Sequence, residues 1–150
     1  MIENLRKTVE VDAELDEVWR AWTTEDGLKF ISSQSNVELV PGGAYEWFLD
    51  LEPDENGKRG GQGARLLAIV PHEMLVFSWT FPPAVASLRK AGAMTQVVVR
   101  FETASNGRTR VRLDAVGWQE GDDWAAGRQY FDNAWDIVLQ RLKEHFAGTR

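Results

Sequence analysis

The chain has 150 residues, the length of one ordinary domain, and we expect a single domain over residues 1–150. It contains no cysteine, which excludes disulfides and thiolate metal sites, and its two histidines, His72 and His145, lie too far apart in sequence to indicate a metal centre. The formal charge of −6 argues against nucleic-acid binding, and no stretch approaches the apolar length of a membrane span. We therefore expect a cytoplasmic protein without a cofactor or metal.

The first predicted elements are a strand and two helices. Alternating apolar and polar residues predict a strand over Leu5–Val11, and Asp12 is a candidate N-cap for the helix that follows. Thr24 is a candidate cap for a second, shorter helix that reaches about Ile31. The first helix carries one apolar stripe at positions i, i+3, i+4 and i+7, formed by Leu15, Val18, Trp19 and Trp22.

Strand patterns dominate the middle of the chain. A polar loop at 52–61 separates them, and residues 82–93 begin with two prolines. Within that second break, Ala84–Ala91 is compatible with a helix that either covers a cavity as a lid or simply connects two strands. The predicted strands are Val37–Val40, Ala44–Leu51, Ala64–Val70, Leu75–Phe81, Thr95–Thr103 and Thr109–Trp118.

The last two strands constrain their own register. Matching their apolar faces requires a connecting loop with an odd number of residues, because a slip of one residue inverts every side chain. We expect Phe101 to lie opposite Leu113, since this pairs Arg100 with Asp114. The alternative, Phe101 opposite Val111, places two arginines opposite each other.

A long helix over Asp122–Phe146 closes the chain, with acidic residues at its start and basic residues at its end, as the helix dipole favours. At 1.5 Å per residue such a helix is about 37 Å long and crosses a whole sheet. Strands that are grouped before a helix, without βαβ alternation, predict the α+β class. We expect a curved antiparallel sheet wrapped around this helix.

Four local motifs resemble the SRPBCC (START-like, pollen-allergen-like) superfamily, in the branch named after the activator of heat-shock protein 90 ATPase. The resemblance covers essentially the whole chain and implies a helix-grip fold with a cavity between the sheet and the last helix. It also implies that this cavity takes lipids, sterols, polyketides or other apolar molecules. The motifs are Val18–Trp22, Val40–Tyr45, Ile69–Pro71 with Leu75–Trp79, and Gly117–Gly121 leading into Ala134–Leu142.

Under this fold, the inward side chains form either an aromatic ligand pocket or a filled core. Arg65 shares the parity of Leu67 and Ile69, so we expect it to point inward and to need a carboxylate or carbonyl partner. Leu49 is also expected to face inward. The candidate ligand-binding residues are Trp47, Leu67, Trp79, Phe81, Val99, Phe101, Leu113, Trp118, Trp124, Phe131 and Trp135.

A catalytic site is hard to assemble from these residues. His72 falls in a predicted turn, His145 lies in the last helical turn, and Glu46 and Asp50 share a strand face expected to be solvated. We therefore expect a non-enzymatic protein that binds a small hydrophobic ligand. Two alternatives stay open: a chaperone-associated interaction module, with possible self-association, and a cyclase- or hydrolase-like enzyme of the same superfamily.

Overall fold

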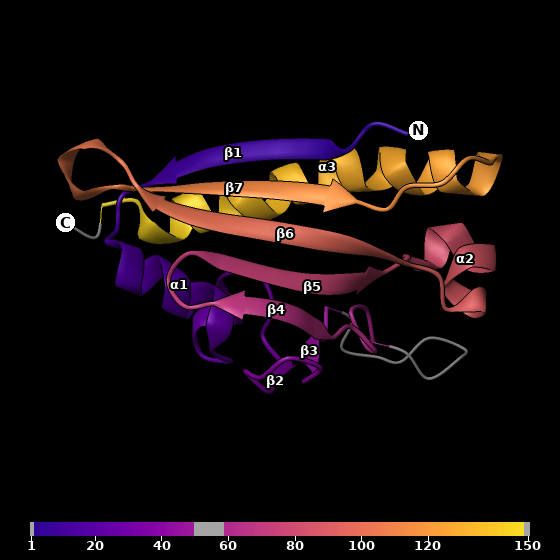
Figure 1. Cartoon of the computed structure of the whole chain (residues 1–150), viewed down its shortest axis with the longest axis horizontal. Helices are drawn as coiled ribbons and strands as arrows, with labels where there is room; N and C mark the ends of the chain where they lie inside the picture. Colours follow the sequence, from indigo (N-terminus) through magenta and orange to yellow (C-terminus); the bar gives the residue numbers. More distant parts are fainter. Residues whose placement is uncertain (1, 50–58, 149–150) are drawn as a thin grey trace.

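The computed structural model describes residues 2–49 and 59–148. A five-stranded antiparallel sheet forms one layer, and one long helix, α3 (Asp122–Phe146), lies across its inner face (Figure 1). The α+β helix-grip fold expected from the sequence is thus confirmed. In spatial order the strands are β1 (Leu5–Val11), β7 (Thr109–Val116), β6 (Met94–Thr103), β5 (Met74–Thr80) and β4 (Leu66–Val70).

Shorter strands and helices pack around the sheet and α3. Strands β2 (Ser35–Val37) and β3 (Tyr45–Trp47) form a separate hairpin beside β4 (Figure 1). The remaining elements are helix α1 (Leu15–Thr23), helix α2 (Ala86–Ala91), and short 3₁₀ helices at Gly27–Phe30, Pro83–Val85 and Ser105–Gly107. No helix in the described part of the chain is long and apolar enough to cross a bilayer.

The predicted cap residues agree with the observed helix starts only in part. The Thr24 hydroxyl accepts a hydrogen bond from the backbone N–H of Gly27 at 2.9 Å and so holds the turn before the second helix, but Asp26 occupies the cap position of that helix. The expected N-cap of α1 is wrong, because the helix begins at Leu15 and Glu14 occupies the cap position. The bounds of α3 agree with the predicted ones at both ends.

The expected register of β6 and β7 is wrong. Phe101 lies opposite Val111, and Arg100 lies opposite Arg112. The loop between the strands spans residues 104–108 and is odd in length, as the face argument requires. The two arginines do not repel each other strongly, because each side chain turns to an acidic neighbour: Arg100 binds Asp114 at 3.0 Å, and Arg112 binds Glu102 at 2.9 Å.

The inward face of β4 differs from the predicted one in the first part of the strand. The pairing with β5 shifts between Leu66 and Ala68, which is the sign of a β-bulge. Leu66 is therefore fully buried, whereas Leu67 is 47% exposed and Arg65 is exposed. The expected inward orientation of Leu67 and Arg65 is wrong, while Ile69, beyond the bulge, packs against the core.

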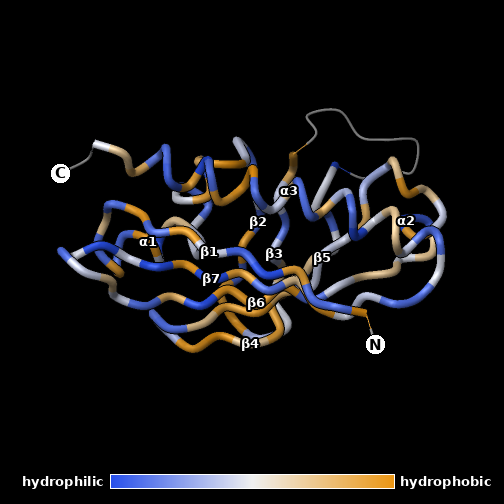
Figure 2. The backbone as a smooth tube through the Cα atoms, turned by 90° about the horizontal axis from the view of Figure 1, so that it is seen from above, coloured by the Kyte–Doolittle hydropathy of each residue, from blue (hydrophilic) through white to orange (hydrophobic). Residues whose placement is uncertain are grey.

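The core lies between the sheet and α3. Seen from above, the strands alternate between hydrophilic and hydrophobic residues, and α3 lies along one side of them (Figure 2). A salt bridge joins the layers at the edge strand: Lys7 Nζ of β1 contacts Asp132 Oδ1 at 2.5 Å and Asp136 Oδ2 at 3.1 Å, both on α3. The helix is thus held against the sheet by apolar packing along its centre and by charge at its side.

Candidate functional site

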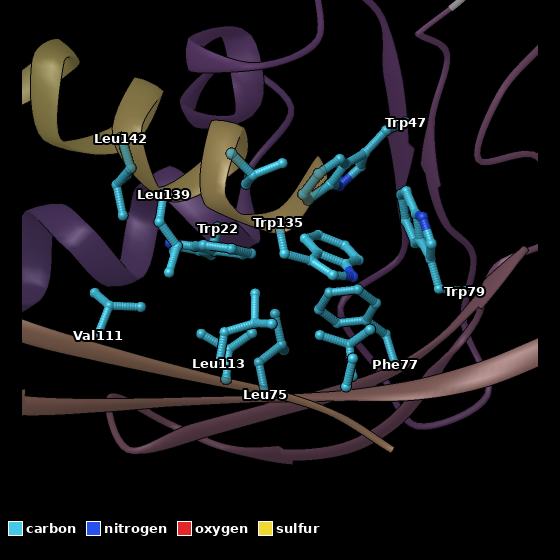
Figure 3. Packing of buried hydrophobic residues seen from close by; sticks show 14 of the residues in the cluster. Trp22, Trp47, Leu75, Phe77, Trp79, Val111, Leu113, Trp135, Leu139 and Leu142 are labelled. Atoms are coloured by element: carbon cyan, nitrogen blue, oxygen red, sulfur yellow. The ribbon is translucent and has the colours of Figure 1, made fainter. Parts of the chain in front are cut away.

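Aromatic side chains fill the centre of the space between the sheet and α3. Trp47 of β3, Trp79 of β5 and Trp135 of α3 converge there (Figure 3), with ring centroids 4.8 Å apart for Trp47–Trp79 and 5.5 Å for Trp79–Trp135. Phe77 and Trp22 complete this group and are fully buried. The open hollow expected at the centre is therefore occupied by the protein's own side chains.

A second aromatic group lies toward the start of α3. Phe81 packs edge-on against Trp124 at 5.0 Å and contacts Trp118 at 6.2 Å. Phe131 connects this group to the first, because its ring stacks on that of Trp135 with an interplanar angle of 24°. The aromatic layer is therefore continuous along about half of the helix.

One buried hydroxyl orders this layer. The Tyr45 hydroxyl donates a hydrogen bond to the carbonyl oxygen of Trp22 at 2.6 Å, which links the hairpin to α1. Burial raises the pKa of the Tyr45 phenol far above its usual value. Tyr45 thus stays a neutral hydrogen-bond donor and has a structural role.

Open space adjoins this aromatic layer at one side of α3. We call it the α3 groove, and it consists of two lobes that share Leu49, Trp79, Tyr130 and Phe131 as walls. The apolar lobe has a volume of about 220 Å³, which is below the roughly 300–1,000 Å³ of pockets that enclose drug-sized ligands. Its other lining residues are Ile31, Trp47, Ala134, Trp135, Ile137 and Val138.

The second lobe of the groove is more polar. It has a volume of about 160 Å³ and extends from Trp79 toward the turn before α2. The buried side chain of Arg89, from the last turn of α2, forms part of its wall. The remaining residues of this lobe are Gly60, Gly61, Thr80, Phe81, Pro82 and Pro83.

Larger hollows lie elsewhere on the surface but have a different character. Volumes of about 680 and 820 Å³ flank Lys7 between β1 and α3. Charged side chains such as Arg6, Arg128 and Glu144 line them. Because an apolar molecule gains binding energy mainly from apolar area removed from water, the smaller α3 groove suits such a ligand better.

The structure distributes the predicted site residues over five places. Trp47, Trp79, Phe131 and Trp135 line the apolar lobe, and Phe81 lines the polar lobe. Trp118 and Trp124 pack around Phe81 outside the groove walls. Three more candidates, Val99, Phe101 and Leu113, are buried on the inner face of the sheet, with Phe101 against Trp19 and Trp22. The last candidate, Leu67, lies on the outer face of β4.

Several groove residues were not among the predicted ones. Tyr130, Ala134 and Ile137 follow i, i+4, i+7 spacing on α3 and therefore form a second apolar line beside the core stripe. This spacing is visible in the sequence and could have identified them as groove residues. Leu49 was expected to face inward but is half-exposed at the rim. Burial of Arg89 has no sequence signal, because its position depends on how α2 packs.

The catalytic candidates lie apart from the groove. His72 Nε2 contacts Asp16 Oδ1 at 2.9 Å, joining the β4–β5 turn to α1. The Glu46 carboxylate accepts hydrogen bonds from Gly63 and Asn36, and Asp50 lies outside the described residues. Within residues 2–49 and 59–148, no group of three or more His, Asp or Glu side chains is placed to hold a metal ion.

Comparisons with known proteins give one family and many structures of the same fold. Residues 12–147 match the family described as Activator of Hsp90 ATPase homolog 1-like protein. No curated protein sequence matches the chain significantly.

Similar solved structures cover nearly the whole chain at low sequence identity. Protein MLL2253 from Mesorhizobium loti is 13% identical, with a TM-score of 0.72 and 95% of each chain covered. The Aha1 dimer from Colwellia psychrerythraea is 21% identical, with a TM-score of 0.69 and coverage of 97% of this chain and 96% of that one. DynU16, from the dynemicin biosynthetic locus, is 18% identical with a TM-score of 0.70, and 100% of this chain matches 49% of it.

Proposed function

The chain belongs to the Activator of Hsp90 ATPase homolog 1-like protein family, and we propose that this member binds a small apolar or amphipathic molecule in the α3 groove. The observation that carries the proposal is an apolar lobe walled by three tryptophans, with half-exposed apolar side chains at its rim. The occurrence of the same fold in DynU16, from the dynemicin biosynthetic locus, is in keeping with a small organic ligand.

The groove offers a physical basis for affinity. Tyr130 and Ile137 are each 46% exposed, so part of their apolar surface faces water. A ligand seated between them and Leu49 removes that surface from water, at about 25 cal/mol per Å² of apolar area. Flat rings also stack favourably on indole side chains, which favours planar apolar molecules.

Blocking the apolar lobe tests this proposal. Ala134 is partly buried in the lobe wall, so Ala134→Phe is expected to fill the lobe with a side chain. Titration of tryptophan fluorescence with decanol should show a saturable change in the wild type, because Trp47, Trp79 and Trp135 line the lobe. We expect at least tenfold weaker binding in Ala134→Phe.

The matched control is Ala126→Phe, which adds the same side chain at an exposed position of α3 that is not among the residues lining the groove. It should bind decanol as the wild type does. Unchanged decanol affinity in a folded Ala134→Phe protein, or no binding of decanol by the wild type, contradicts the proposal.

A second candidate function is an interaction module, including self-association. Four apolar residues are exposed on β4 and in the β2–β3 connection: Leu67 and Val70 lie on β4, and Leu39 and Val40 lie in the connection. The Gly42 N–H donates to the Leu66 carbonyl and the Leu66 N–H donates to the Gly43 carbonyl, which holds the turn that follows Val40 against this strand. If the protein self-associates through this surface, Leu67→Asp should weaken self-association in sedimentation velocity and leave decanol binding unchanged. A monomeric wild type argues against self-association.

A further inference from the structure

The sheet ends at β1, and in the described part of the chain no strand pairs with the second edge of β1. Two surface hollows run along this edge, one beside residues 6–9 and the other beside residues 2–7, and α3 forms their other wall. The edge is therefore open to contact from outside. An uncovered edge strand is a template for pairing with another chain.

Charges alternate across the outer face of the sheet, and the alternation stops at β1. In one row of cross-strand neighbours, Arg110 lies between Glu102 and Glu10 and contacts their carboxylates at 3.3 Å and 3.0 Å. In a second row, Asp114 lies opposite Arg6, at a distance of 3.4 Å. The first row thus reaches the open edge with an anion, and the second row reaches it with a cation.

A second, antiparallel copy of β1 complements this edge when the two-fold axis passes through Thr8. Arg6 of each copy then lies opposite Glu10 of the other, and all seven residues of β1 are paired. Each charged row continues across the contact with alternating sign, from Glu102 of one copy to Asp114 of the other. Opposite charges on cross-strand neighbours stabilise a strand pair, as do two threonines facing each other.

Other symmetric registers that match the faces of the strands are less favourable. An axis at Arg6, Lys7 or Glu10 places that charged residue opposite its own copy, and like charges directly opposite each other are destabilising. An axis at Val9 leaves Leu5 and Arg6 beyond the end of the other strand. The sequence of β1 therefore favours the register centred on Thr8.

The charge of Lys7 on the inner face does not oppose this contact. An inward-pointing charge on an edge strand commonly prevents pairing with another chain. Here Lys7 Nζ already contacts Asp132 and Asp136 of its own helix, and the side chain is only 16% exposed. In the register centred on Thr8 the other copy presents Val9 to Lys7, so no like charge meets it.

From these observations we propose that two copies of this chain pair through β1 around Thr8 and join their five-stranded sheets into one. Backbone hydrogen bonds between the two strands supply the contact, and the Arg6–Glu10 pairs fix its register. The inference does not depend on ligand binding in the α3 groove. It also uses the edge of the sheet opposite to β4, where the exposed Leu67 lies.

Reversal of charge on either side of the contact tests the proposal. Sedimentation velocity over a range of protein concentrations should show a monomer–dimer equilibrium for the wild type. Arg6→Glu and Glu10→Arg should each weaken the dimer by about tenfold, because each places two like-charge pairs across the axis. An equimolar mixture of the two variants should regain the wild-type affinity, because the mixed dimer has opposite charges at both positions.

The matched control is Arg100→Glu, which reverses an exposed charge on the same face of the sheet but on β6. It should leave the dimer affinity unchanged. Circular dichroism verifies that each variant is folded, and recovery of affinity in the mixture is independent evidence of folding.

A disulfide tests the register. The chain has no cysteine, so Thr8→Cys introduces a single thiol, and the axis places two such thiols opposite each other. Residues directly opposite in antiparallel strands have Cα atoms about 4.5–5.5 Å apart, a separation that a disulfide can bridge. Oxidation should give a covalent dimer of Thr8→Cys. Thr103→Cys, at an exposed position that ends β6, should stay monomeric at the same concentration.

Three results would overturn the inference. The first is a wild type that stays monomeric at millimolar concentration. The second is a dimer that Leu67→Asp weakens and the charge reversals leave intact, because the contact then lies on β4. The third is a mixture of folded Arg6→Glu and Glu10→Arg that does not regain affinity, which contradicts the pairing around Thr8.

Discussion

Trp79 of β5 and Trp135 of α3 lie with their ring centroids 5.5 Å apart, and together they form the wall between the filled interior and the α3 groove. Each therefore has one side in the core and another against the groove. This relationship explains why one aromatic layer can both stabilise the fold and offer a binding surface. It also means that stability and binding must be measured separately for any change in this wall.

Substitutions at Trp135 and Ile137 should affect stability and ligand binding differently. Trp135 is 2% exposed and contacts Trp47, Phe77 and Phe131, so Trp135→Ala should lower the free energy of unfolding by about 3–5 kcal/mol. Ile137→Ala removes a half-exposed side chain at the rim of the groove. It should change the free energy of unfolding by at most about 0.5 kcal/mol while weakening decanol binding. Urea unfolding measures both values. Equal destabilisation by the two substitutions contradicts the described core.

Gly127 of α3 should resist substitution by alanine. A Cβ atom at this position would lie 2.4 Å from Phe81 Cε1, and the Phe81 ring is enclosed by Trp118, Trp124 and Phe131. In an open helix this change stabilises by about 1 kcal/mol. Here we expect a net loss of about 1–3 kcal/mol from overpacking.

The control for this steric effect is Asn133→Ala, at an exposed position of the same helix. It should leave the thermal midpoint unchanged or slightly raised. If Gly127→Ala also raises the midpoint, the close approach of α3 to Phe81 is wrong.

The Lys7–Asp132 contact should make stability depend on acid pH. The hydrogen bond from Lys7 and its positive charge lower the pKa of Asp132 below its ordinary 3.8 in the folded protein. A carboxyl whose pKa is lower in the folded state stabilises fully above its unfolded pKa, and this contribution is lost as the pH falls through the folded pKa. The difference in urea midpoint between wild type and Asp132→Asn should therefore be present at pH 7 and be lost progressively as the pH falls below 3.8.

Alkaline pH tests the other partner of this contact. Burial lowers the pKa of Lys7, but its hydrogen bonds to Asp132 and Asp136 and their charges outweigh that effect and raise it above 10.5. The contribution of Lys7 is therefore complete below pH 10.5 and is lost only at higher pH. Lys7→Met should be less stable than the wild type at pH 7 by urea unfolding, and an unchanged midpoint argues against the contact.

The backbone conformation of the β6–β7 loop can be tested by substitution. Asn106 has a left-handed backbone conformation, with φ 61° and ψ 33°, and Gly107 follows with φ 70°. Asn106→Ala should lower the free energy of unfolding by about 1 kcal/mol, because residues with a Cβ atom disfavour this region, while Asn106→Gly should be nearly neutral. Ser105→Ala is the exposed control. Equal stability of the alanine and glycine variants contradicts this loop conformation.

The sequence alone determined the order of elements, both ends of α3 and the α+β class, because these depend on periodicity, capping and charge within short segments. It also identified Trp47, Trp79 and Trp135 as side chains of the sheet–helix interface. Only the tertiary structure decided where space remains between those side chains. A bulge after Leu66 turned Arg65 outward, and the packing of α2 buried Arg89, because both depend on contacts between segments distant in sequence.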